Sequence, residues 1–470
     1  MDMTLGTRPA GMPRRISGLA PAGEDGRPDH GEPDGASQAA PPLVPHWRTR
    51  YAHAEPEVWT HRMLKALDTG INGGKWYNLI DKLYRPSVLL EAFAQVKANG
   101  GAAGVDHVTV AHFEAQLAAN LDMLHEALRS GTYRPQRIRR HWIPKPGSLE
   151  KRPLGIPTVR DRVVQTALRM VMEPIFEKEF APHSYGFRPK KGCKEALRRV
   201  DELLKAGYVY IVDADLKSYF DTIPQHRLMA LVTKRICDSA VLRLVESFLQ
   251  QEVLDGLAAW TPEAGTPQGA VISPLLSNIY LDPLDHLMAQ RGFEMVRYAD
   301  DFVVMCQSPE EAAAALDAVR EWTAQAGLVL HPDKTRLADE RIEGFEFLGY
   351  RFIKHRRWPR KKSMLKFRDA IRAKTSRTAG QSLKTIIAEV NKTARGWFEY
   401  FKHSGKAAFP DADGFIRRRL RSLLRQHTGR KGTAKPSGAD QTRWPIAYFD
   451  SFGLFNLTTA HKLAIQSLNR

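Results

Sequence analysis

The stretch Met295-Val296-Arg297-Tyr298-Ala299-Asp300-Asp301-Phe302-Val303-Val304-Met305 places two adjacent carboxylates between two apolar runs. Apolar runs on both sides of a short polar step are typical of a β-hairpin, so we predict two strands whose turn carries Asp300 and Asp301. Two neighbouring carboxylates repel each other and stay ionised together only beside a positive charge. For this hairpin alone, a solvated turn pair is as good an interpretation as a pair of Mg²⁺ ions.

A second acidic segment lies upstream, where residues 208–216 read Tyr-Val-Tyr-Ile-Val-Asp-Ala-Asp-Leu. This run predicts a strand, and its alternation places Asp213 and Asp215 on the same face. Acids on a buried strand are unusual unless they meet cations. Asp215, Asp300 and Asp301 are the kind of ligands that two Mg²⁺ ions need for phosphoryl transfer, in which one ion activates a hydroxyl and the other stabilises pyrophosphate.

The charge of the chain predicts a polyanionic partner. The 470 residues carry a formal net charge of +18, which is most simply matched by nucleic acid. An anionic membrane surface is the alternative, but no strongly amphipathic basic helix with an aromatic face stands out at a terminus. No apolar run is long enough to cross a bilayer. Three cysteines, Cys193, Cys237 and Cys306, lie far apart. Their spacing excludes a disulfide framework and a Cys-rich zinc module, and it suits a reducing cytosol.

Residues 134–162 are dense in Arg and Lys with Pro and Gly between them. We predict short strands at 143–145 and 152–156, joined by the turn Pro146-Gly147. Fixed cations on such a hairpin can clamp a triphosphate, although a solvated charged face is the usual meaning of a charge run. The glycine-rich stretch 99–106 is either a phosphate loop or a flexible connector. Residues 184–189 mix aromatic rings with cations, which suits single-stranded nucleic acid.

The remaining pattern is mostly helical. Apolar periodicity predicts helices over 163–180, 271–287 and 309–326, with short strands at 328–330 and within 346–353. Beyond residue 353 the chain becomes strongly basic, and two amphipathic helices follow, one running from Leu383 to Phe401 and the other through Ile416 to Leu424. Residues 1–46 are rich in Pro, Gly and Ala and carry few large apolar side chains, so we expect a disordered extension, or an N-terminus that is not native.

Six motifs then occur in a fixed order, and together they resemble group II intron-encoded reverse transcriptase/maturases. They are Leu154-Gly155-Ile156-Pro157, Ser184-Tyr185-Gly186-Phe187-Arg188-Pro189, the run 212–221, Thr266-Pro267-Gln268-Gly269, Tyr298-Ala299-Asp300-Asp301 and Phe347-Leu348-Gly349-Tyr350. The resemblance implies an α+β fold of the right-hand polymerase type. Fingers and palm with an antiparallel sheet would occupy 55–360, an α-helical thumb/maturase domain 361–430, and a short nucleic-acid-binding segment 431–470.

The resemblance also implies site residues. Asp215, Asp300 and Asp301 would be catalytic and hold two Mg²⁺ ions. The nucleotide site would comprise two triphosphate cations, a bulky ring that excludes a ribose 2′-hydroxyl, a loop beside the nucleotide and a lysine that donates a proton to pyrophosphate: Lys145, Arg152, Phe220, Gln268, Gly269 and Lys334. The primer grip would be Leu348, Gly349 and Tyr350. Intron RNA would be bound by Arg395, Trp397, Arg417, Arg418 and Arg419. For Phe220 and Lys334, core packing and an ordinary surface lysine are the plain alternatives.

The partners implied are intron RNA, an RNA template, a DNA primer, deoxynucleoside triphosphates and target DNA, with no membrane. Many relatives carry a C-terminal zinc-bearing endonuclease with paired cysteines, and we expect the branch that lacks it, working as a bacterial cytoplasmic ribonucleoprotein. The expected function is RNA-directed DNA synthesis together with maturase assistance in splicing. A domesticated reverse transcriptase in defence or DNA repair, and an RNA-binding splicing cofactor with an idle polymerase site, are the alternatives.

Overall fold

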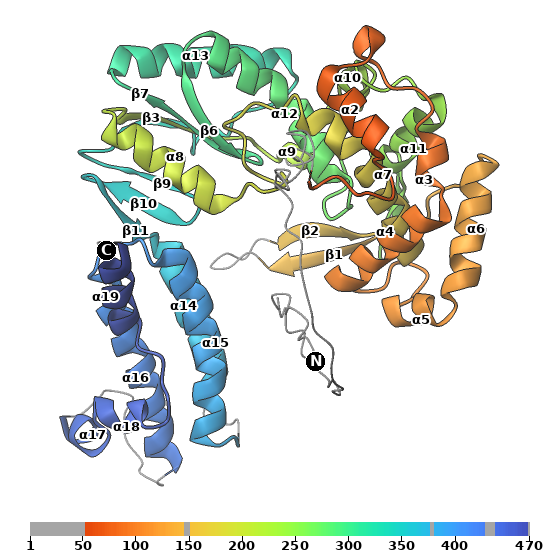
Figure 1. Cartoon of the computed structure of the whole chain (residues 1–470). Coiled ribbons are helices and arrows are strands. Elements are labelled where there is room, and N and C mark those ends of the chain that lie inside the picture. The colour runs from red at the N-terminus through yellow and green to blue at the C-terminus, as the bar shows by residue number, and fades with distance from the viewer. Residues whose placement is uncertain (1–51, 145–150, 377–379, 428–437, 469–470) are drawn as a thin grey trace, which may run out of the picture. The chain divides into compact units, whose positions relative to one another are not determined.

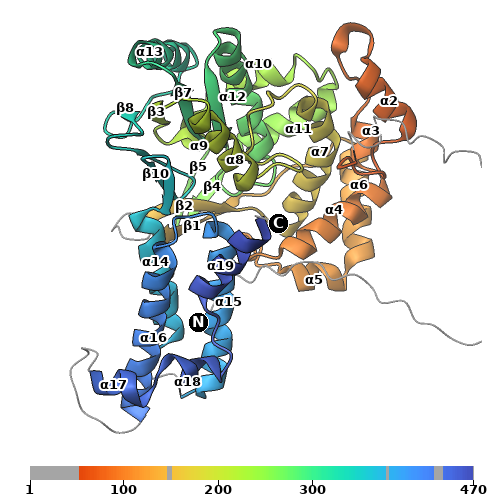
Figure 2. The same cartoon turned by 60° about the vertical axis from the view of Figure 1, so that its left-hand side comes forward.

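The computed structural model describes residues 52–144, 151–376, 380–427 and 438–468, all within one compact unit that spans His46–Arg470 (Figures 1 and 2). Four predictions fall on residues outside these ranges. They are the disordered extension 1–46, the triphosphate cation Lys145, the turn Pro146-Gly147, and the parts of the C-terminal segment at 431–437 and 469–470. Within the described ranges, no helix combines the length and the apolar character that a membrane span requires.

The first part of the described chain is helical. Its elements are α2 (His61–Thr69), a 3₁₀ turn η1 (Asn72–Gly74), α3 (Ile80–Leu83), α4 (Pro86–Asn99), α5 (Val110–Ala115), α6 (Leu117–Arg129) and, after the first strands, α7 (Val159–Glu177). Helix α7 is buried on almost every side, and α4 packs along it. The glycine-rich loop is held by its carbonyls, because the Arg162 guanidinium donates to Gly100 O at 3.1 Å and Ala102 O at 2.6 Å. These bonds favour the connector interpretation over a phosphate loop.

The basic hairpin is part of a four-stranded sheet with the order β2-β1-β4-β5. Strand β1 (Ile138–Pro144) runs antiparallel to β2 (Lys151–Ile156) and parallel to β4 (Val253–Asp255), which pairs with β5 (Ala258–Trp260). The predicted hairpin is therefore confirmed, but β1 begins five residues earlier than expected, at Ile138. Ile138 is the buried residue of an otherwise partly or fully exposed strand, so apolar periodicity gave little signal for its start.

The acidic strand and the acidic hairpin share a second sheet, with the order β6-β7-β3-β8. It comprises β3 (Tyr210–Asp215), β6 (Glu294–Tyr298), β7 (Asp301–Cys306) and β8 (Arg336–Asp339). The pairing of β3 with β7 is antiparallel and sets Asp215 opposite Asp301. The predicted hairpin and the strand that carries Asp213 and Asp215 are thus confirmed. The turn, however, is Ala299-Asp300 rather than Asp300-Asp301, because Asp301 already pairs with Tyr298 as the first residue of β7.

The two faces of this sheet are covered by different helices (Figure 1). Side chains such as Val212, Phe302 and Val304 join the larger core, to which α12 (Ser273–Gln290) and α13 (Pro309–Gln325) contribute. Side chains such as Ile211 and Val303 join a second core with α8 (Cys193–Lys205). Because strand side chains alternate, Asp213, Asp215 and Asp301 continue the row of Ile211 and Val303 at the open end of the second face.

One strand prediction is wrong. Residues 328–330 form no strand, and Leu330 makes only an isolated bridge with Leu216. The fourth strand of the sheet is instead β8, in which Leu337 is exposed and only Ala338 is buried. Its outward leucine and flanking charges hide the alternation by which a half-buried strand is recognised.

A third sheet, of order β11-β10-β9, follows. It contains β9 (Phe345–Phe347), β10 (Tyr350–Ile353) and β11 (Arg356–Pro359). The predicted pair within 346–353 is confirmed, and β11 is an addition, since Arg356 and Arg357 read as the beginning of a basic run. Phe345 and Phe352 stack with ring centroids 4.9 Å apart and fill the inner face.

The C-terminal part is helical and has its own core. Helices were predicted around 383–401 and 416–424, whereas those beyond residue 437 were not, and residues such as Phe449 and Leu457 of the segment expected to be separate belong to the same core. It contains α14 (Lys361–Lys374), α15 (Leu383–Phe401), α16 (Ala408–His427), α17 (Gly438–Arg443), α18 (Ile446–Asp450) and α19 (Leu457–Leu468). Three helices near the middle of the chain complete the elements: α9 (Tyr219–Thr222), α10 (Gln225–Val232) and α11 (Ser239–Leu249).

In the C-terminal part, Asp413 of α16 caps α19, because its carboxylate accepts from Leu457 N at 2.9 Å and Thr458 N at 3.0 Å. The C-terminal helices are thereby tied to one another by a buried polar contact.

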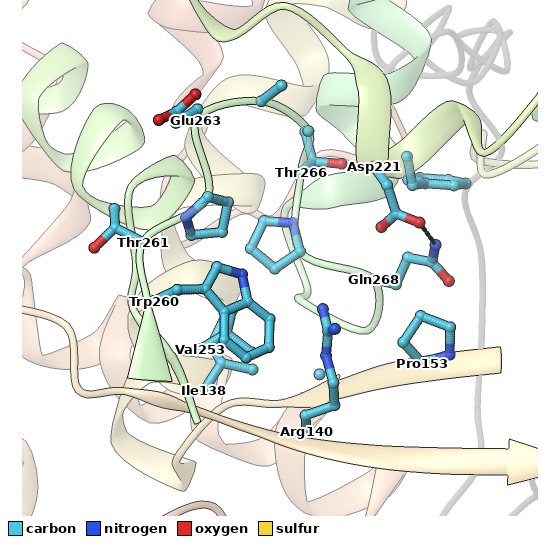
Figure 3. Close-up of a pocket in the computed structure, with 16 residues that line it drawn as sticks. Ile138, Arg140, Pro153, Asp221, Val253, Trp260, Thr261, Glu263, Thr266 and Gln268 are labelled. Atoms are coloured by element: carbon cyan, nitrogen blue, oxygen red, sulfur yellow. Dashed lines mark hydrogen bonds between the residues drawn. The ribbon is translucent and has the colours of Figure 1, made fainter. Parts of the chain in front are cut away.

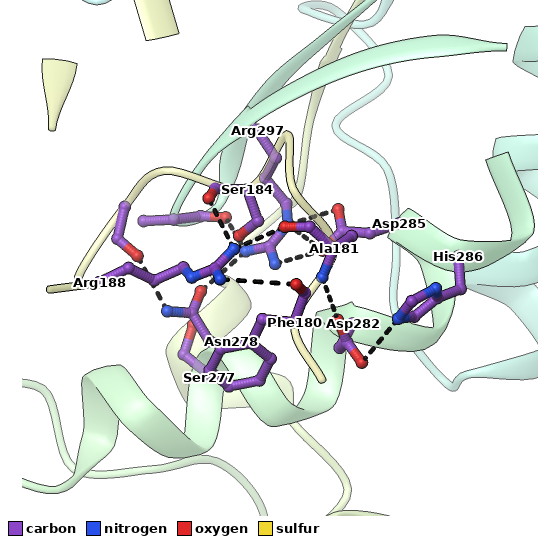
Figure 4. Close-up of polar contacts among 12 residues, drawn as sticks. Phe180, Ala181, Ser184, Arg188, Ser277, Asn278, Asp282, Asp285, His286 and Arg297 are labelled. Atoms are coloured by element: carbon purple, nitrogen blue, oxygen red, sulfur yellow. Dashed lines mark hydrogen bonds and ion pairs between the residues drawn. The ribbon is translucent and has the colours of Figure 1, made fainter. Parts of the chain in front are cut away.

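A buried arginine anchors the acidic hairpin (Figure 4). Arg297 on β6 is fully buried, and its Nε donates to both oxygens of Asp285 on α12, at 2.8 and 3.0 Å. Its Nη1 donates to Asn278 Oδ1 at 2.9 Å and to Ala299 O at 3.0 Å. One guanidinium therefore joins the helix, the strand and the turn that precedes Asp300.

The turn itself is strained and tightly enclosed. Ala299 has a φ of +60°, which a residue with a side chain adopts at a cost. Gly186 lies against it so closely that a Cβ there would stand 2.2 Å from Ala299 N, and only glycine fits. Tyr185 N donates to Arg297 O at 2.8 Å on the same side. The position of Asp300 is therefore set by neighbours on several elements.

We predict that Asp285→Ala lowers the free energy of unfolding by about 3–5 kcal/mol, because it leaves a buried guanidinium without its carboxylate. Urea unfolding followed by circular dichroism measures the change. Asp317→Ala is the matched control: Asp317 pairs with Arg320 on α13 with side chains 74% and 60% exposed, and its loss costs about 1 kcal/mol or less. Equal effects of the two variants would contradict a structural role for the buried pair.

Candidate active site

The three predicted catalytic carboxylates meet at one end of the second sheet. Asp215 is the last residue of β3, Asp301 is the first residue of β7, and the two are register partners. Asp300 precedes Asp301 in the turn held by Arg297. Antiparallel pairing thus brings together acids that are distant in sequence, because the end of one strand faces the beginning of the other.

Crowding changes the ionisation of these acids. Burial, followed by repulsion from Asp213, Asp300 and Asp215, raises the pKa of Asp301 to about 7, although part of the residue stays exposed. Burial and the charge of Asp215 likewise raise the pKa of Asp300. Burial also raises the pKa of Asp213 to about 6, against the opposing effect of Arg336. The protein holds more negative charge at this point than it neutralises by itself.

Cationic side chains lie around the acidic cluster but do not neutralise all of its negative charge. Lys334 Nζ lies 2.5 Å from Asp215 Oδ2, and Arg336 Nε lies 3.5 Å from Asp213 Oδ2. Arg152 on β2 lowers the pKa of Asp300 by its charge, and Arg360 does the same for Asp301. The structure thus places Arg152 and Lys334, both predicted nucleotide contacts, within electrostatic range of the carboxylates.

The carboxylates of the cluster are suitable ligands for divalent cations, although they do not by themselves complete the coordination of a metal ion. In the part of the chain that the structure describes, no three acid, His or Cys side chains are gathered closely enough to hold a metal by themselves. Mg²⁺ is commonly held by one or two carboxylates, with water and substrate phosphates as its other ligands. Burial, and to a lesser extent repulsion between neighbouring carboxylates, raises the pKa values of Asp300 and Asp301, and a divalent cation would relieve that repulsion.

The loop Thr266-Pro267-Gln268-Gly269 is fixed by backbone hydrogen bonds between the first and second sheets. Thr266 N donates to Phe220 O at 2.7 Å, and Gly155 N on β2 donates to Gln268 O at 2.6 Å. Gly269 has a φ of +100°, and a Cβ there would stand 2.4 Å from Gly155 O. The structure therefore brings Phe220, Gln268 and Gly269 next to the strand that carries Arg152.

A pocket of about 560 Å³ opens beside this loop (Figure 3). Phe220 and Gln268 line it, and Gln268 Nε2 donates to Asp221 Oδ2 at 2.9 Å. Phe220 is half-buried and meets Tyr219 edge to face, with centroids 5.4 Å apart. The Phe220 ring thus packs at the edge of the core and also lines the pocket. Both interpretations of Phe220, core packing and exclusion of a ribose 2′-hydroxyl, are compatible with this position.

The predicted primer-grip residues form the tight turn between β9 and β10. Leu348 and Gly349 have φ values of +46° and +82°. Leu348 O accepts from the Tyr400 hydroxyl at 2.7 Å, and Gly349 O accepts from Ser363 Oγ at 3.0 Å. Tyr350 is buried, and its hydroxyl donates to Tyr400 O. Leu348 and Gly349 are partly open to a ligand, whereas the Tyr350 ring supports the turn from inside.

The predicted RNA-binding residues divide in two. Arg395 and Arg418 are exposed, with the Arg395 guanidinium 4.5 Å from the Phe455 ring centroid, and Arg417 is partly exposed. Trp397 instead packs 4.6 Å from Phe367 and 5.0 Å from Phe401, measured between ring centroids. That ring is committed to the core.

Two further cationic positions also face inward. Arg419 donates to Thr375 Oγ1 at 3.0 Å and to Thr375 O at 2.9 Å. Arg188, which the sequence suggested for contact with nucleic acid, is buried, pairs with Glu177 at 2.8 Å and donates to Ser184 O at 2.9 Å. The expected role for the cation of that motif is wrong, because burial and a buried partner leave it no access to a ligand.

Sequence reasoning gave no role to Asp221, Arg336 or Arg360. Asp221 sits in the quoted motif run, yet its bond to Gln268 joins two loops that no local pattern connects. Arg336 is the first residue of β8 and Arg360 directly follows β11, and neither strand was predicted. Because residues 335–339 show no apolar alternation, no local signal could have found β8.

The comparisons with known proteins agree with this geometry. Residues 143–352 match the family described as "Reverse transcriptase (RNA-dependent DNA polymerase)", and residues 364–439 match "Group II intron, maturase-specific domain". "Protein YkfC" of Escherichia coli (strain K12) is 34% identical over 322 residues, which are 59% of this chain and 83% of that protein. "Group II intron-encoded protein LtrA" of Lactococcus lactis subsp. cremoris is 36% identical over 210 residues, 44% of this chain and 34% of LtrA.

Among solved structures, the "Partial Cas6-RT-Cas1--Cas2 complex" aligns with 53% of this chain and 41% of its own at a TM-score of 0.34 and 24% identity, too low to support an argument. The sequence relatives carry more weight, since the match to YkfC spans most of that protein and both family domains occur in this chain in succession. The protein has an α+β fold in which the reverse transcriptase region precedes an α-helical region. The chain belongs to the group II intron-encoded reverse transcriptases and maturases, a family of RNA-directed DNA polymerases.

Proposed function

We propose that Asp215, Asp300 and Asp301 form the polymerase centre of this chain, and that its C-terminal helices bind the intron RNA that it assists in splicing and copies into DNA. The observation that carries the proposal is the register pairing of Asp215 with Asp301, next to the turn that holds Asp300. In such a centre, RNA is the template, a DNA strand at the target site is the primer, and deoxynucleoside triphosphates are the substrates. The bacterial origin of YkfC and LtrA supports a cytoplasmic ribonucleoprotein as the setting.

Two Mg²⁺ ions at these carboxylates would lower the pKa of the primer 3′-hydroxyl and stabilise charge on the leaving pyrophosphate. Asp215, Asp300 and Asp301 would hold them. The charge of Arg152 acts on Asp300, and Arg152 would supply a fixed cation for the triphosphate. Lys334, which pairs with Asp215 at 2.5 Å, is near enough to donate a proton to the departing pyrophosphate once that pair opens.

Phe220 is proposed to select deoxynucleotides. Its backbone is fixed by Thr266 and its ring is braced by Tyr219, so the ring cannot easily withdraw from the pocket. A rigid ring at that place excludes an extra hydroxyl by size. Gln268 and Gly269 would shape the loop beside the base of the nucleotide.

RNA binding is proposed for Arg395, Arg417 and Arg418 on α15 and α16. Their charges reach solvent to different degrees, and the helices have a separate core that holds them in place. Such contacts with phosphates make affinity depend on salt. Trp397 and Arg419 support these helices from within.

We predict that Asp300→Ala reduces primer extension on poly(rA)/oligo(dT) by at least a hundredfold, because a ligand of the reacting centre is lost. Intron RNA affinity, measured by filter binding, should stay within about twofold. Asp333→Ala, at an exposed acid beside Lys334, is the control and should retain extension. Loss of both activities in Asp300→Ala would count against separate polymerase and RNA-binding surfaces.

Phe220→Ala should raise the relative use of ribonucleotides by about tenfold or more, since space for a 2′-hydroxyl appears. The ratio of kcat/KM for dTTP and UTP in single-nucleotide extension is the readout. Phe220→Tyr keeps the ring and should keep the selectivity. An unchanged ratio in Phe220→Ala would show that the ring serves only the core.

The double variant Arg417→Gln, Arg418→Gln should weaken intron RNA binding, because two cations that face phosphates are removed. The plot of log affinity against log salt should become less steep by about one unit for each phosphate that the protein no longer neutralises. Arg320→Gln on α13, an exposed arginine, controls for net charge. If the slope of the double variant equals that of the wild type, the RNA lies elsewhere.

A further inference from the structure

Two exposed tryptophans enclose an arginine on the first sheet. The Arg140 guanidinium lies 4.6 Å from the Trp260 ring centroid and 5.5 Å from that of Trp142. Trp142 is 41% exposed and Trp260 is 36% exposed. Large exposed rings are costly to leave in water, and a guanidinium between two of them makes a row of flat surfaces. Figure 3 shows Arg140 and Trp260 side by side at the pocket.

The sheet holds this row in a fixed orientation. Arg140 and Trp142 are two residues apart on β1 and therefore share a face. The Trp142 indole Nε1 donates to Asp255 Oδ2 at 3.0 Å on the adjacent β4. Trp260 pairs in register with Val253, the residue of β4 that pairs with Ile138. The rings thus belong to β1 and β5, which lie on either side of β4 in one sheet, rather than to free loops.

The row continues into the pocket that contains Phe220 and Gln268. Arg140, Trp260, Phe220, Asp221 and Gln268 all line it, and Figure 3 shows Asp221 and Gln268 on the side of the pocket away from Trp260. The Asp221 carboxylate is already engaged by Gln268. Much of the remaining lining is proline and small or apolar residues: Ile138, Pro153, Val253, Pro262, Ala264, Gly265 and Pro267.

Such a lining suits a planar base better than a phosphate. Among the described residues that line the pocket, Arg140 is the only cation, and its planar face is covered by tryptophan, whereas a triphosphate needs several open donors. Aromatic and guanidinium planes stack on unpaired nucleobases of any sequence, as template reading requires. Because Phe220 and Gln268 are shared with the proposed nucleotide site, a base here would lie next to the nascent pair.

We propose that Trp142, Arg140 and Trp260, with the pocket between them and Phe220, bind the unpaired template bases that lie ahead of the position being copied. The inference rests on the proposed polymerase function and adds the path of the template strand to it. Stacking on these planar side chains keeps the template bases unpaired and ordered before they reach the position being copied. The row is therefore a binding site for single-stranded RNA.

The test compares two RNA template/DNA primer duplexes that differ only in the template 5′ overhang, one nucleotide or five, without deoxynucleotides present. The wild-type protein should bind the longer overhang about tenfold more tightly, since stacking is worth about 1–3 kcal/mol per base. Trp260→Ala should abolish that preference, and Trp260→Phe should keep most of it. Replacing the overhang bases by abasic sites should remove the preference from the wild-type protein as well.

Leu257→Ala, a fully exposed position between β4 and β5, is the matched control and should change nothing. A preserved overhang preference in Trp260→Ala would overturn the proposal, as would a preference that survives abasic substitution, which would indicate phosphate contacts. A higher KM for deoxynucleotides with an intact overhang preference would also overturn it and assign the pocket to the nucleotide. Primer extension by the wild-type protein is measured separately: its failure would refute the proposed function without deciding overhang binding.

Discussion

The guanidinium of Arg297 is the interaction on which the arrangement of the site depends. A fully buried charge is tolerated only where its hydrogen bonds are satisfied, and here a carboxylate, an amide and a carbonyl accept them. Those acceptors come from α12 and from the turn before Asp300, so one side chain sets a helix, a strand and a left-handed backbone position at once. The cost of the strained Ala299 is offset by this network and by the glycine that packs on it.

Because side chains alternate between the two faces of a strand, the carboxylates of the acidic cluster gather at one end of one face without destabilising the rest of the sheet. Asp213, Asp215 and Asp301 occupy the end of a row whose other members are apolar and covered by α8 and the third sheet. The apolar part of the row supplies stability, and its last positions carry charge that repels. Cations at Lys334 and Arg336 on one segment and at Arg152 on β2 reduce that repulsion, which keeps the cluster folded and still leaves it short of positive charge.

The sequence was informative where the signal is local. The acidic hairpin, the strand of Asp215 and helices α15 and α16 follow from alternation or helical period, and the motif order led to the right family. The solvent exposure of individual side chains could not be predicted from the sequence in the same way. From the sequence alone, Trp397 and Arg188 are expected to contact nucleic acid, but tertiary packing turns both side chains inward. Strand β8 was missed because its leucine faces outward. Contacts such as Gln268 with Asp221 join loops whose proximity only the fold determines.

The turn between β9 and β10 is bonded to α15 in both directions, since Tyr350 donates to Tyr400 O and the Tyr400 hydroxyl donates to Leu348 O. Two tyrosines therefore act as a mechanical linkage between a β-turn and the end of a long helix. The helix cannot pivot away without breaking both bonds and exposing an aromatic cluster around Phe401. Any force on α15 is therefore transmitted to that turn, so the helix and the turn move as one mechanical unit.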